Sequence, residues 1–432
     1  MFCLLGGELR LLSLIESLPV YFFSLYKAPK VVVDKLERIM KRFLWAGNED
    51  VNKINWVAWD RVTLPVKSGG LGIHKLMVVN DALLLKWGWR YRVETCSLWR
   101  RVIEECHHSR VVWSAIPCNK YISSPWKTIV KLSEAKRVHG KKFNSFIKAC
   151  VGNGRTIRFW CDCWIGQEAF KDKWPVIFRL EKSKRCSISD RIRQVRGDWI
   201  MCWDWSRNPD TAEALHQMQE LTALLSNICL EDRKDKWKWD NNAPKGFSIA
   251  AVKKLITDIS AVEVYKFFWV SWVPLKCNIF AWRAELNRIP TRVELDKRRV
   301  NFGSLECVLC GEADESVTHL FTGCSMVNQV WHAIAIWCNI PPFFVFEVRD
   351  CLEMFKTFGG EKTRKKIFQG IIIVTLWCIW MNRNDRLFNR KNVNARDIVA
   401  DVKSKSFFWL KHRSRMKSII WREWCKFPMY ML

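Results

Sequence analysis

The sequence predicts an α+β chain that is mostly α-helical, with small β elements and several modules. Its 432 residues allow two to four domains at roughly 100 to 200 residues each. Hydrophobic residues make up 49% of the chain, with 19 glycines and 13 prolines, which excludes a collagen-like or wholly disordered protein. Apolar residues recur at helical spacing towards both ends, whereas the middle is divided into short β-prone pieces.

The first hundred residues favour helices. Apolar positions recur every three or four residues from Leu9 to Pro19 and again from Val33 to Phe43, which predicts two helices around an aromatic connector. Gly69 and Gly70 indicate a turn. The apolar run that follows predicts a helix capped by Asn80.

Between about 120 and 250 the pattern changes to short segments bounded by Gly and Asp. Residues 156–160 are rich in β-formers, and residues 235–240 alternate strictly between charged and apolar side chains. We therefore expect small β elements in this stretch.

Helical spacing returns after residue 270. Pro274 suits the first turn of a helix, and Pro290 ends it. The apolar face of this helix comprises Ile279, Trp282, Leu286 and Ile289. Thr291 and Glu294 then have the spacing of a capping box, which predicts a second helix ending in a basic triplet.

The charge balance points to a polyanionic partner. Lys and Arg total 71 against 43 acidic residues, a net charge of +28, so nucleic acid is the first candidate and an anionic membrane surface the second. The longest apolar run, residues 370–381, is shorter than the roughly 20 residues that cross a bilayer, so we expect a buried helix and no membrane partner.

The N-terminus and the cysteines predict an intracellular chain. The apolar residues 1–25 lack a basic leader, and their first charge is Glu8, so we expect no secretion and a nuclear or cytoplasmic location. The 18 cysteines are mostly irregularly spaced, which favours reduced thiols over a disulfide framework.

One group of soft ligands has metal-site spacing. Cys307 and Cys310 form C-x2-C, and after eight further residues His319 and Cys324 form H-x4-C. Three thiolates and one imidazole can close a tetrahedral zinc site with no open position, which favours one structural zinc over a catalytic one. We expect Ser325 to cap the following helix, and the segment to be disordered without metal because such sites bind with on the order of 10 kcal/mol or more.

Two other groups of potential ligands are weaker candidates. Cys96 and Cys106 with the adjacent His107 and His108 fit no standard metal module. The C-x-C that begins at Cys161 lies outside the one tight group of soft ligands in the chain, so packing is the better interpretation.

These residues resemble a family: the C-terminal portion of plant non-LTR (LINE-type) retrotransposon polyproteins, including the reverse transcriptase zinc-binding domain. The matching stretch comprises residues 273–276, 280–283, 286–291, 295, 307–311, 315–321, 324 and 330–331. The resemblance implies that Cys307, Cys310, His319 and Cys324 are the zinc ligands.

The resemblance extends over nearly the whole chain and implies its division. Residues 1–115 resemble the thumb or connection region of the reverse transcriptase, and 116–250 an inter-domain stretch with short β elements that includes residues 151–154 and 159–162. Residues 251–345 resemble the zinc-binding domain itself. Residues 346–432 form a basic, Trp-rich helical region that contains the family's late helix at 380–385.

The sequence argues against catalysis by these residues alone. A reverse transcriptase needs paired aspartates to hold its two metal ions, and this chain contains no Asp-Asp dipeptide. The resemblance places the fingers and palm upstream of Met1. We therefore expect no intrinsic RNA-directed DNA polymerase activity, and the first hypothesis is a zinc-stapled module that binds RNA or DNA.

The strongest local basic patch follows the predicted helix. It comprises Arg283, Arg288, Arg292, Lys297, Arg298 and Arg299. Its arginines interleave with Trp282 in the manner of a surface that tracks phosphates and stacks bases, although a solvated helix face explains the charges equally well and a core position explains Trp282 better. The 26 tryptophans of the chain mark either cores or stacking faces.

Two further hypotheses remain open at the level of sequence. The chain could belong to an active polymerase whose catalytic half lies in a longer product, or act with a reverse transcriptase core in trans. It could also be a protein-interaction module or a relic without function, since C-x2-C sites serve protein contacts as readily as nucleic acid.

Overall fold

The computed structural model describes residues 19–46, 54–107, 116–119, 121–195, 198–226, 228–239, 246–257, 265–300, 303–357 and 359–428. They form two compact units. The middle unit comprises Glu16–Glu37 and His74–Val262, and the C-terminal unit contains Arg38–Ile73 and Glu263–Leu432. The sequence-based division into ranges 1–115, 116–250, 251–345 and 346–432 stays a prediction.

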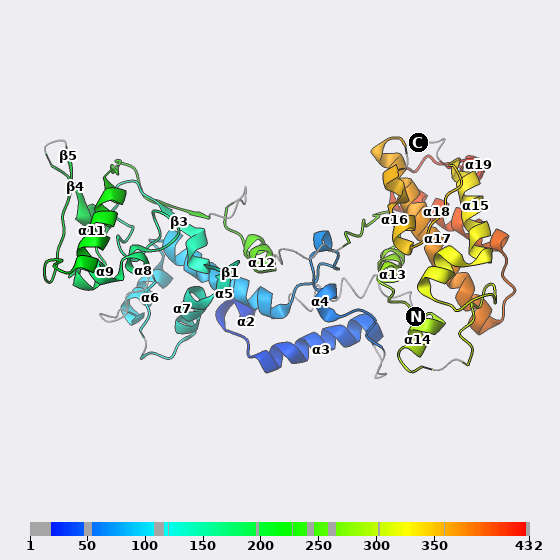
Figure 1. Cartoon of the computed structure of the whole chain (residues 1–432), viewed down its shortest axis with the longest axis horizontal. Helices are drawn as coiled ribbons and strands as arrows, with labels where there is room; N and C mark the ends of the chain where they lie inside the picture. The colour runs from blue at the N-terminus through cyan, green and yellow to red at the C-terminus, as the bar shows by residue number, and fades with distance from the viewer. Residues whose placement is uncertain are drawn as a thin grey trace. The chain divides into compact units, whose positions relative to one another are not determined.

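The mostly helical α+β fold class is confirmed. Most elements are helices, and the described strands pair only in two-stranded sheets (Figure 1). The predicted helix over Val33–Phe43 lies within α3 (Lys30–Ala46). The predicted helix over 9–19 falls outside the described residues, and the expected connector contains a short helix, α2 (Val20–Leu25).

The middle unit is organised around α5 (Leu76–Val93), which is buried on several faces because Leu83, Leu84 and Leu85 are consecutive apolar residues. Asn80 lies inside this helix, so the predicted N-cap is wrong. Its fully buried amide accepts from the Ala28 backbone N–H (3.0 Å) and donates to the carbonyls of Phe23 in α2 and of Tyr26 directly after it. Asn80 therefore holds the connector against α5 through hydrogen bonds and does not cap the start of α5.

The other elements of the middle unit are short. Its helices are α6 (Leu98–His107), α7 (Pro125–Ala135), η2 (Phe143–Phe146), α8 (Phe170–Lys173), α9 (Pro175–Leu180), α10 (Ile188–Arg191), α11 (Ala212–Leu225) and α12 (Ile249–Thr257). Its strands are β1 (Arg137–Val138), β2 (Lys141–Lys142), β3 (Ile147–Cys150), β4 (Ile192–Val195), β5 (Asp198–Met201) and β6 (Lys236–Trp239).

The charged and apolar alternation in 235–240 does form a strand. β6 pairs antiparallel with β3, with Ile147 opposite Trp239, and both of these side chains face the core. Residues 156–160 form turns with one isolated bridge at Arg158, so the β-strand expected there is wrong. Phe159 and Trp160 are buried in an aromatic cluster, so these β-favouring residues serve core packing and not strand pairing.

One carboxylate shapes the glycine-rich loop that precedes this cluster. Asp235 accepts backbone N–H bonds from Gly152 (2.8 Å), Gly154 (2.9 Å) and Thr156 (2.9 Å), and these bonds lower its pKa against the opposing effect of burial. A β-carbon at Gly152 would lie 2.1 Å from the Arg233 carbonyl oxygen, so only glycine fits this close approach.

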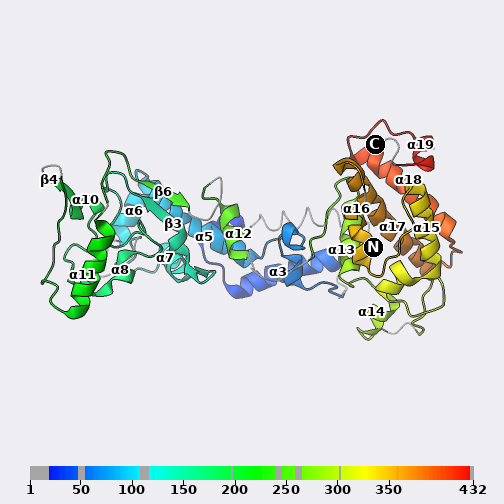
Figure 2. The same ribbon diagram turned by 45° about the horizontal axis from the view of Figure 1, so that its top comes forward.

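The C-terminal unit packs its helices around α17 (Lys362–Asn389), whose segment from Ile367 to Trp380 is buried. Figures 1 and 2 show α17 beside α18 (Ala395–Arg413). The remaining helices are α4 (Trp59–Val62), η1 (Val66–Ser68), α13 (Leu275–Glu285), α14 (Arg292–Asp296), η3 (His319–Gly323), α15 (Ser325–Cys338), α16 (Val348–Thr357) and α19 (Trp421–Lys426). The apolar run 370–381 is thus a buried helix segment, as expected.

The predicted start of α14 needs correction. Thr291 is its N-cap residue, but the Thr291 hydroxyl makes no capping bond and is buried without a partner. Glu294 instead pairs with Lys297 (2.7 Å) and Arg298 (3.0 Å), so the capping box is wrong. The basic residues that follow the helix compete for the carboxylate that the box requires.

Two chain-wide expectations can be compared with the described residues. Within them, none of the helices has the length and apolarity needed to cross a membrane. The 17 cysteines in the described ranges are drawn as free thiols, and the reduced state of the chain stays a prediction.

Candidate metal centre

The first two candidate ligands lie on a tight turn. The Cys307 backbone N–H donates to Ala313 (2.7 Å), and the Gly311 N–H donates back to the Cys307 carbonyl (2.8 Å). Gly311 has φ +74°, a left-handed conformation that glycine adopts without strain. This closed turn brings Cys307 and Cys310 to the same side of the chain.

The other two ligands flank one helical turn. His319 begins η3, with its N–H bonded to the Ser316 hydroxyl (3.0 Å). Cys324 is the N-cap of α15, so Ser325 is the first helical residue and not the predicted cap. The Ser325 hydroxyl donates to Glu312 instead (3.0 Å), which ties the start of α15 to the turn.

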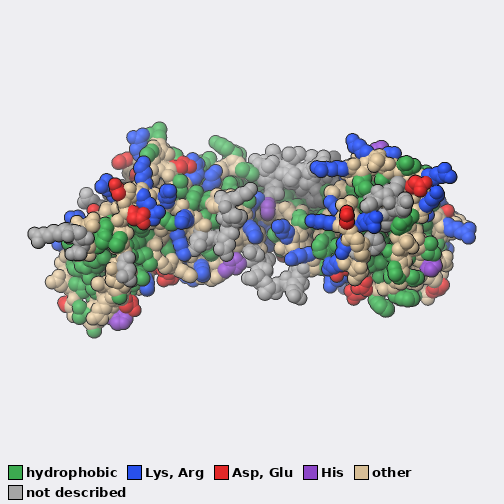
Figure 3. Space-filling model, turned by 90° about the horizontal axis from the view of Figure 1, so that it is seen from above, with side chains coloured by type: hydrophobic (Ala, Val, Ile, Leu, Met, Phe, Trp, Pro, Cys, Tyr) green, Lys and Arg blue, Asp and Glu red, His purple; other side chains and the backbone are tan. Residues whose placement is uncertain are grey.

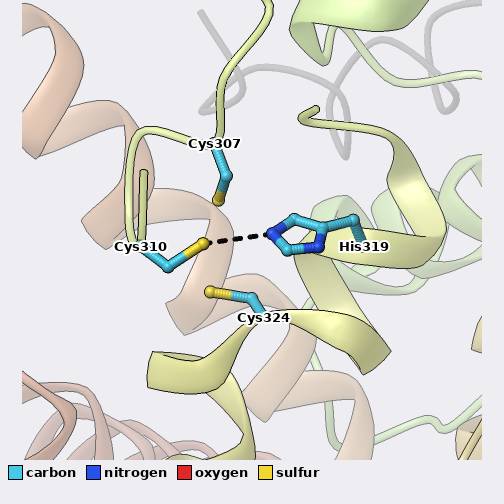
Figure 4. A group of neighbouring side chains, drawn as sticks. All are labelled: Cys307, Cys310, His319 and Cys324. Carbon is cyan, nitrogen blue, oxygen red and sulfur yellow. Dashed lines mark hydrogen bonds between the residues drawn. The ribbon is translucent and has the colours of Figure 1, made fainter. Parts of the chain in front are cut away.

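The structure brings all four predicted ligands together. Their ligand atoms all lie within 4.8 Å of one another, and the Cys310 sulfur lies 3.2 Å from His319 Nε2 (Figure 4). Cys307 and Cys324 are buried, and the other two ligands are half-buried. Sulfur ligands at about 2.3 Å from a tetrahedral zinc lie roughly 3.8 Å apart, so the donor set and its spacing fit this metal.

Backbone N–H groups prepare the sulfurs for the metal. Cys310 accepts from the Glu312 N–H (3.4 Å), Cys307 from those of Leu309 and Cys310, and Cys324 from that of Val327 in the first turn of α15. Hydrogen bonding from the Cys324 thiol, together with the N–H groups of Leu309 and Cys310, lowers the pKa of Cys307, whereas donating that bond and burial raise the pKa of Cys324. Such donors stabilise the thiolate, which is the form that binds zinc.

A buried ion pair stabilises the turn that carries Cys307 and Cys310. Glu315 and Arg383 are 0% and 2% exposed at their side chains and form a two-bond pair, with Arg383 Nε donating to Glu315 Oε2 (3.0 Å). The same carboxylate accepts the N–H of Arg292 (3.1 Å) and that of Val308 within the metal-binding turn (3.4 Å). Glu315 therefore links the turn, α14 and α17.

Sequence reasoning did not assign Glu315 and Arg383 to the site. Both lie in the stretches that carry the resemblance, and Arg383 lies two residues after the apolar run 370–381 of α17. A charged residue so close to a buried helical segment is a signal for a buried partner. What the sequence lacks is the identity of that partner, which is 68 positions away.

The six predicted nucleic-acid residues do not form one exposed patch. Arg283 is 4% exposed, with its guanidinium over the rings of Trp45 (5.4 Å) and Trp56 (5.7 Å), and burial lowers its pKa to about 9. Trp282 is also buried, with its indole N–H bonded to the Gly69 carbonyl (2.9 Å). Neither side chain offers a free surface to a nucleic acid.

The other five residues differ in exposure. Arg288, Lys297 and Arg299 are exposed, whereas Arg292 and Arg298 are half-buried. Arg292 donates to the Glu306 carbonyl (2.8 Å), and Arg298 lies over Trp56 (4.5 Å). The exposed members are therefore the ones available to phosphates.

The weaker metal candidates do not form a ligand group in the described residues. Cys161 and Cys163 are buried, and burial raises the pKa of both thiols, as expected for packing. His107 Nε2 lies 3.2 Å from the Ser124 hydroxyl, and His108 falls outside the described residues. Across the described ranges, the Cys307 cluster is the one group of three or more His, Cys, Asp or Glu residues with metal-site spacing.

Comparison with known proteins places this centre in a recognised region. Residues 247–331 match the family described as zinc-binding in reverse transcriptase. This range includes α13, α14, η3 and all four ligands. The chain therefore carries a zinc-binding region of the reverse transcriptase type.

Two proteins of Arabidopsis thaliana are similar to the chain. One, named "Putative ribonuclease H protein At1g65750", is 25% identical over 411 residues, which are 92% of this chain and 63% of that protein. The chain thus spans less than two thirds of this relative. The other, named "Uncharacterized mitochondrial protein AtMg00310", is 30% identical over 156 residues, which are 35% of this chain and 95% of that protein.

The match covers 95% of AtMg00310 at 30% identity, which shows that the two proteins share a family. The chain belongs to the same family as the uncharacterized mitochondrial protein AtMg00310. Together with the reverse transcriptase zinc-binding region, these similarities support descent from a retroelement.

Proposed function

We propose that the chain is a nucleic-acid-binding module held by one structural zinc ion, derived from the C-terminal part of a plant LINE-type, non-LTR reverse transcriptase polyprotein. The observation that carries this proposal is the convergence of Cys307, Cys310, His319 and Cys324 within the range that matches zinc-binding in reverse transcriptase. These residues would hold the metal, which would supply a rigid cross-link and no open coordination position.

The surroundings of the ligands support a structural role. Two of the four ligands are buried, the turn is closed by backbone hydrogen bonds, and Glu315 ties it to the central helix α17. A zinc ion here would join the turn to α15, and the buried ion pair would join the turn to α14 and α17. Zinc in this position would stabilise the fold of the C-terminal unit and would not take part in catalysis.

The net charge and the sequence similarities support nucleic acid as the partner. The net charge is +28, and Lys and Arg side chains cover more of the face seen in Figure 3 than acidic ones do. The names of the matched family and of one relative refer to reverse transcriptase and ribonuclease H, which both work on nucleic acids. A partner core that supplies polymerase activity in trans belongs to the same proposal.

The test is fluorescence anisotropy of the zinc-loaded chain with a structured RNA and with a DNA duplex, at 50 and 200 mM salt. If several phosphates are neutralised, affinity falls by about a hundred-fold or more between these two concentrations. Cys307→Ser is the variant that removes one ligand, and Cys351→Ser, a buried cysteine of α16 outside the cluster, is its matched control.

Salt-sensitive binding that drops in Cys307→Ser and persists in Cys351→Ser supports the proposal. Binding that survives loss of the ligand assigns the contact to basic helices that act without zinc. A folded chain that binds neither probe at 50 mM salt overturns nucleic-acid binding and leaves a protein-interaction module or a relic.

A further inference from the structure

A second site candidate is a pocket of about 650 Å³ in the C-terminal unit, formed by α17, α18, α14 with the preceding Pro290, and Lys276 of α13. Its volume is within the range of small-molecule pockets in proteins. Aromatic side chains line much of it: Trp377, Trp380 and Phe388 on α17, and Trp409 on α18.

Two helices present their pocket-lining residues at regular spacing. On α17, residues 377, 381, 384 and 388 recur every three or four positions and lie on one face, and the neighbouring residues 380, 383, 385 and 387 widen the lining to either side. On α18, Asp401, Lys405 and Trp409 follow at intervals of four and share one face. The packing of α17 against α18 places these two faces around one hollow.

Two hydrogen-bond donors on lining residues are buried without a partner. One is the indole N–H of Trp380, a side chain that is 1% exposed, and the other is Nε of Arg292. Both atoms are closed off from solvent, so an occupant reaches them only if a neighbouring side chain moves aside. The accessible lining is aromatic, with Phe388 67% exposed and Trp409 half-buried, and it therefore points to an occupant with a flat, apolar face.

The charged groups that line the pocket are mixed. Lys276, with its ammonium 5.6 Å from the Trp377 ring centre, Arg292 and Lys405 provide positive charge. Asp401 is paired with Lys405 (2.7 Å) and accepts from Asn382, and Asp385 accepts from Asn389 (3.1 Å). Arg383 also lines the pocket, with its charge balanced by Glu315.

We propose that this pocket takes an unpaired nucleobase of single-stranded RNA or DNA, with the adjoining phosphate near Lys276 and Arg292. The inference rests on the proposed function and names its substrate class. Every nucleobase has a flat face for stacking on tryptophan and ring or carbonyl acceptors at its edge. A base within a duplex is already stacked and paired, so the pocket selects single strands.

The metal centre is linked to this pocket through Glu315. The carboxylate that holds the zinc-binding turn also accepts the N–H of Arg292 and pairs with Arg383, and both arginines line the pocket. Zinc at the Cys307 cluster would therefore fix one wall of the base pocket.

The test uses the full zinc-loaded chain and a twelve-nucleotide strand, as RNA and as DNA, with 2-aminopurine at one position. Trp409→Ala removes a half-buried ring of the pocket, and Trp409→Phe restores an aromatic face. Phe408→Ala is the matched control, because Phe408 is the adjacent residue of α18, 58% exposed and outside this pocket.

We expect Trp409→Ala to weaken strand binding about ten-fold at constant salt and to abolish the 2-aminopurine fluorescence change, with duplex affinity unchanged. Trp409→Phe recovers most of the affinity, and Phe408→Ala matches the wild type. The comparison of RNA with DNA shows which strand the pocket prefers.

Unchanged strand affinity in a folded Trp409→Ala variant overturns the pocket inference and assigns the pocket to another occupant, such as a protein segment. If binding in that variant still depends on salt, the proposed function stands. An equal loss for strand and duplex also overturns it. A wild-type chain that binds no strand at low salt overturns the proposed function and the inference together.

Discussion

Replacing Glu315 with alanine should destabilise the C-terminal unit by about 3–5 kcal/mol. The side chains of Glu315 and Arg383 are 0% and 2% exposed, so removal of the carboxylate leaves an uncompensated buried guanidinium. The backbone N–H groups of Arg292 and Val308 lose their acceptor as well. Breaking a buried pair is expensive because solvent does not reach the remaining charge.

The assay is urea unfolding of the zinc-loaded protein, followed by tryptophan fluorescence. The single variants Glu315→Leu and Arg383→Met and the double variant Glu315→Leu/Arg383→Met form a double-mutant cycle beside Glu315→Ala. The double variant should lose less stability than Glu315→Ala, because no isolated charge remains buried. Glu353→Ala is the control: its carboxylate pairs with Lys356 near the surface of α16, and its loss should cost about 1 kcal/mol or less.

Zinc affinity provides a second readout of the same variant. Because Glu315 holds the Val308 N–H inside the metal-binding turn, Glu315→Ala should weaken zinc binding about 10- to 100-fold, the usual effect of losing a residue that orients the ligands. The reasoning is refuted if Glu315→Ala costs under about 1 kcal/mol, or if the two single changes are additive in the double variant.

Three further changes test the packing of the two units. Gly370→Ala should destabilise the C-terminal unit by at least about 1–3 kcal/mol in urea unfolding, because the new β-carbon would lie 2.0 Å from a ring carbon of Trp272; a neutral result would show that α17 shifts freely. Asn80→Ala should cost the middle unit about 3 kcal/mol by leaving three backbone groups without partners, whereas a loss below 1 kcal/mol would show that water replaces the amide. Asp235→Ala should cost about 2 kcal/mol at pH 7. The folded-state pKa of Asp235 is lowered, so its contribution is present above the unfolded value near 3.9 and is lost as pH falls through the folded value; a thermal melt that shows the same variant deficit at pH 2 as at pH 7 would contradict this.

Spacing within a short stretch of sequence was sufficient to predict which four potential metal ligands converge. Four residues within 18 positions carry soft donor atoms, and few arrangements of C-x2-C and H-x4-C bring them together. The buried helix over residues 370–381 was predictable for a similar reason, since an unbroken apolar run leaves no solvent-facing side. Local patterns succeed where local residues make the contacts.

Long-range contacts explain the predictions that were wrong. Asn80 was expected to cap a helix because asparagine favours that position, yet its amide serves the connector after α2, more than 50 residues earlier. Arg283 was expected on a basic face, but its charge lies over Trp45 and Trp56, which periodicity within α13 does not reveal. The capping box at Glu294 failed because two basic residues compete for its carboxylate.

The most direct test of the central claim is X-ray absorption spectroscopy at the zinc edge, combined with metal analysis of the purified chain. We expect one zinc per chain, with three sulfurs at about 2.3 Å and one nitrogen at about 2.0–2.1 Å. Cys324→Ser should lose a sulfur from that shell or release the metal, while Cys351→Ser should leave it unchanged. A shell that contains a water oxygen, or a chain that retains no zinc, would contradict a closed structural site at Cys307, Cys310, His319 and Cys324.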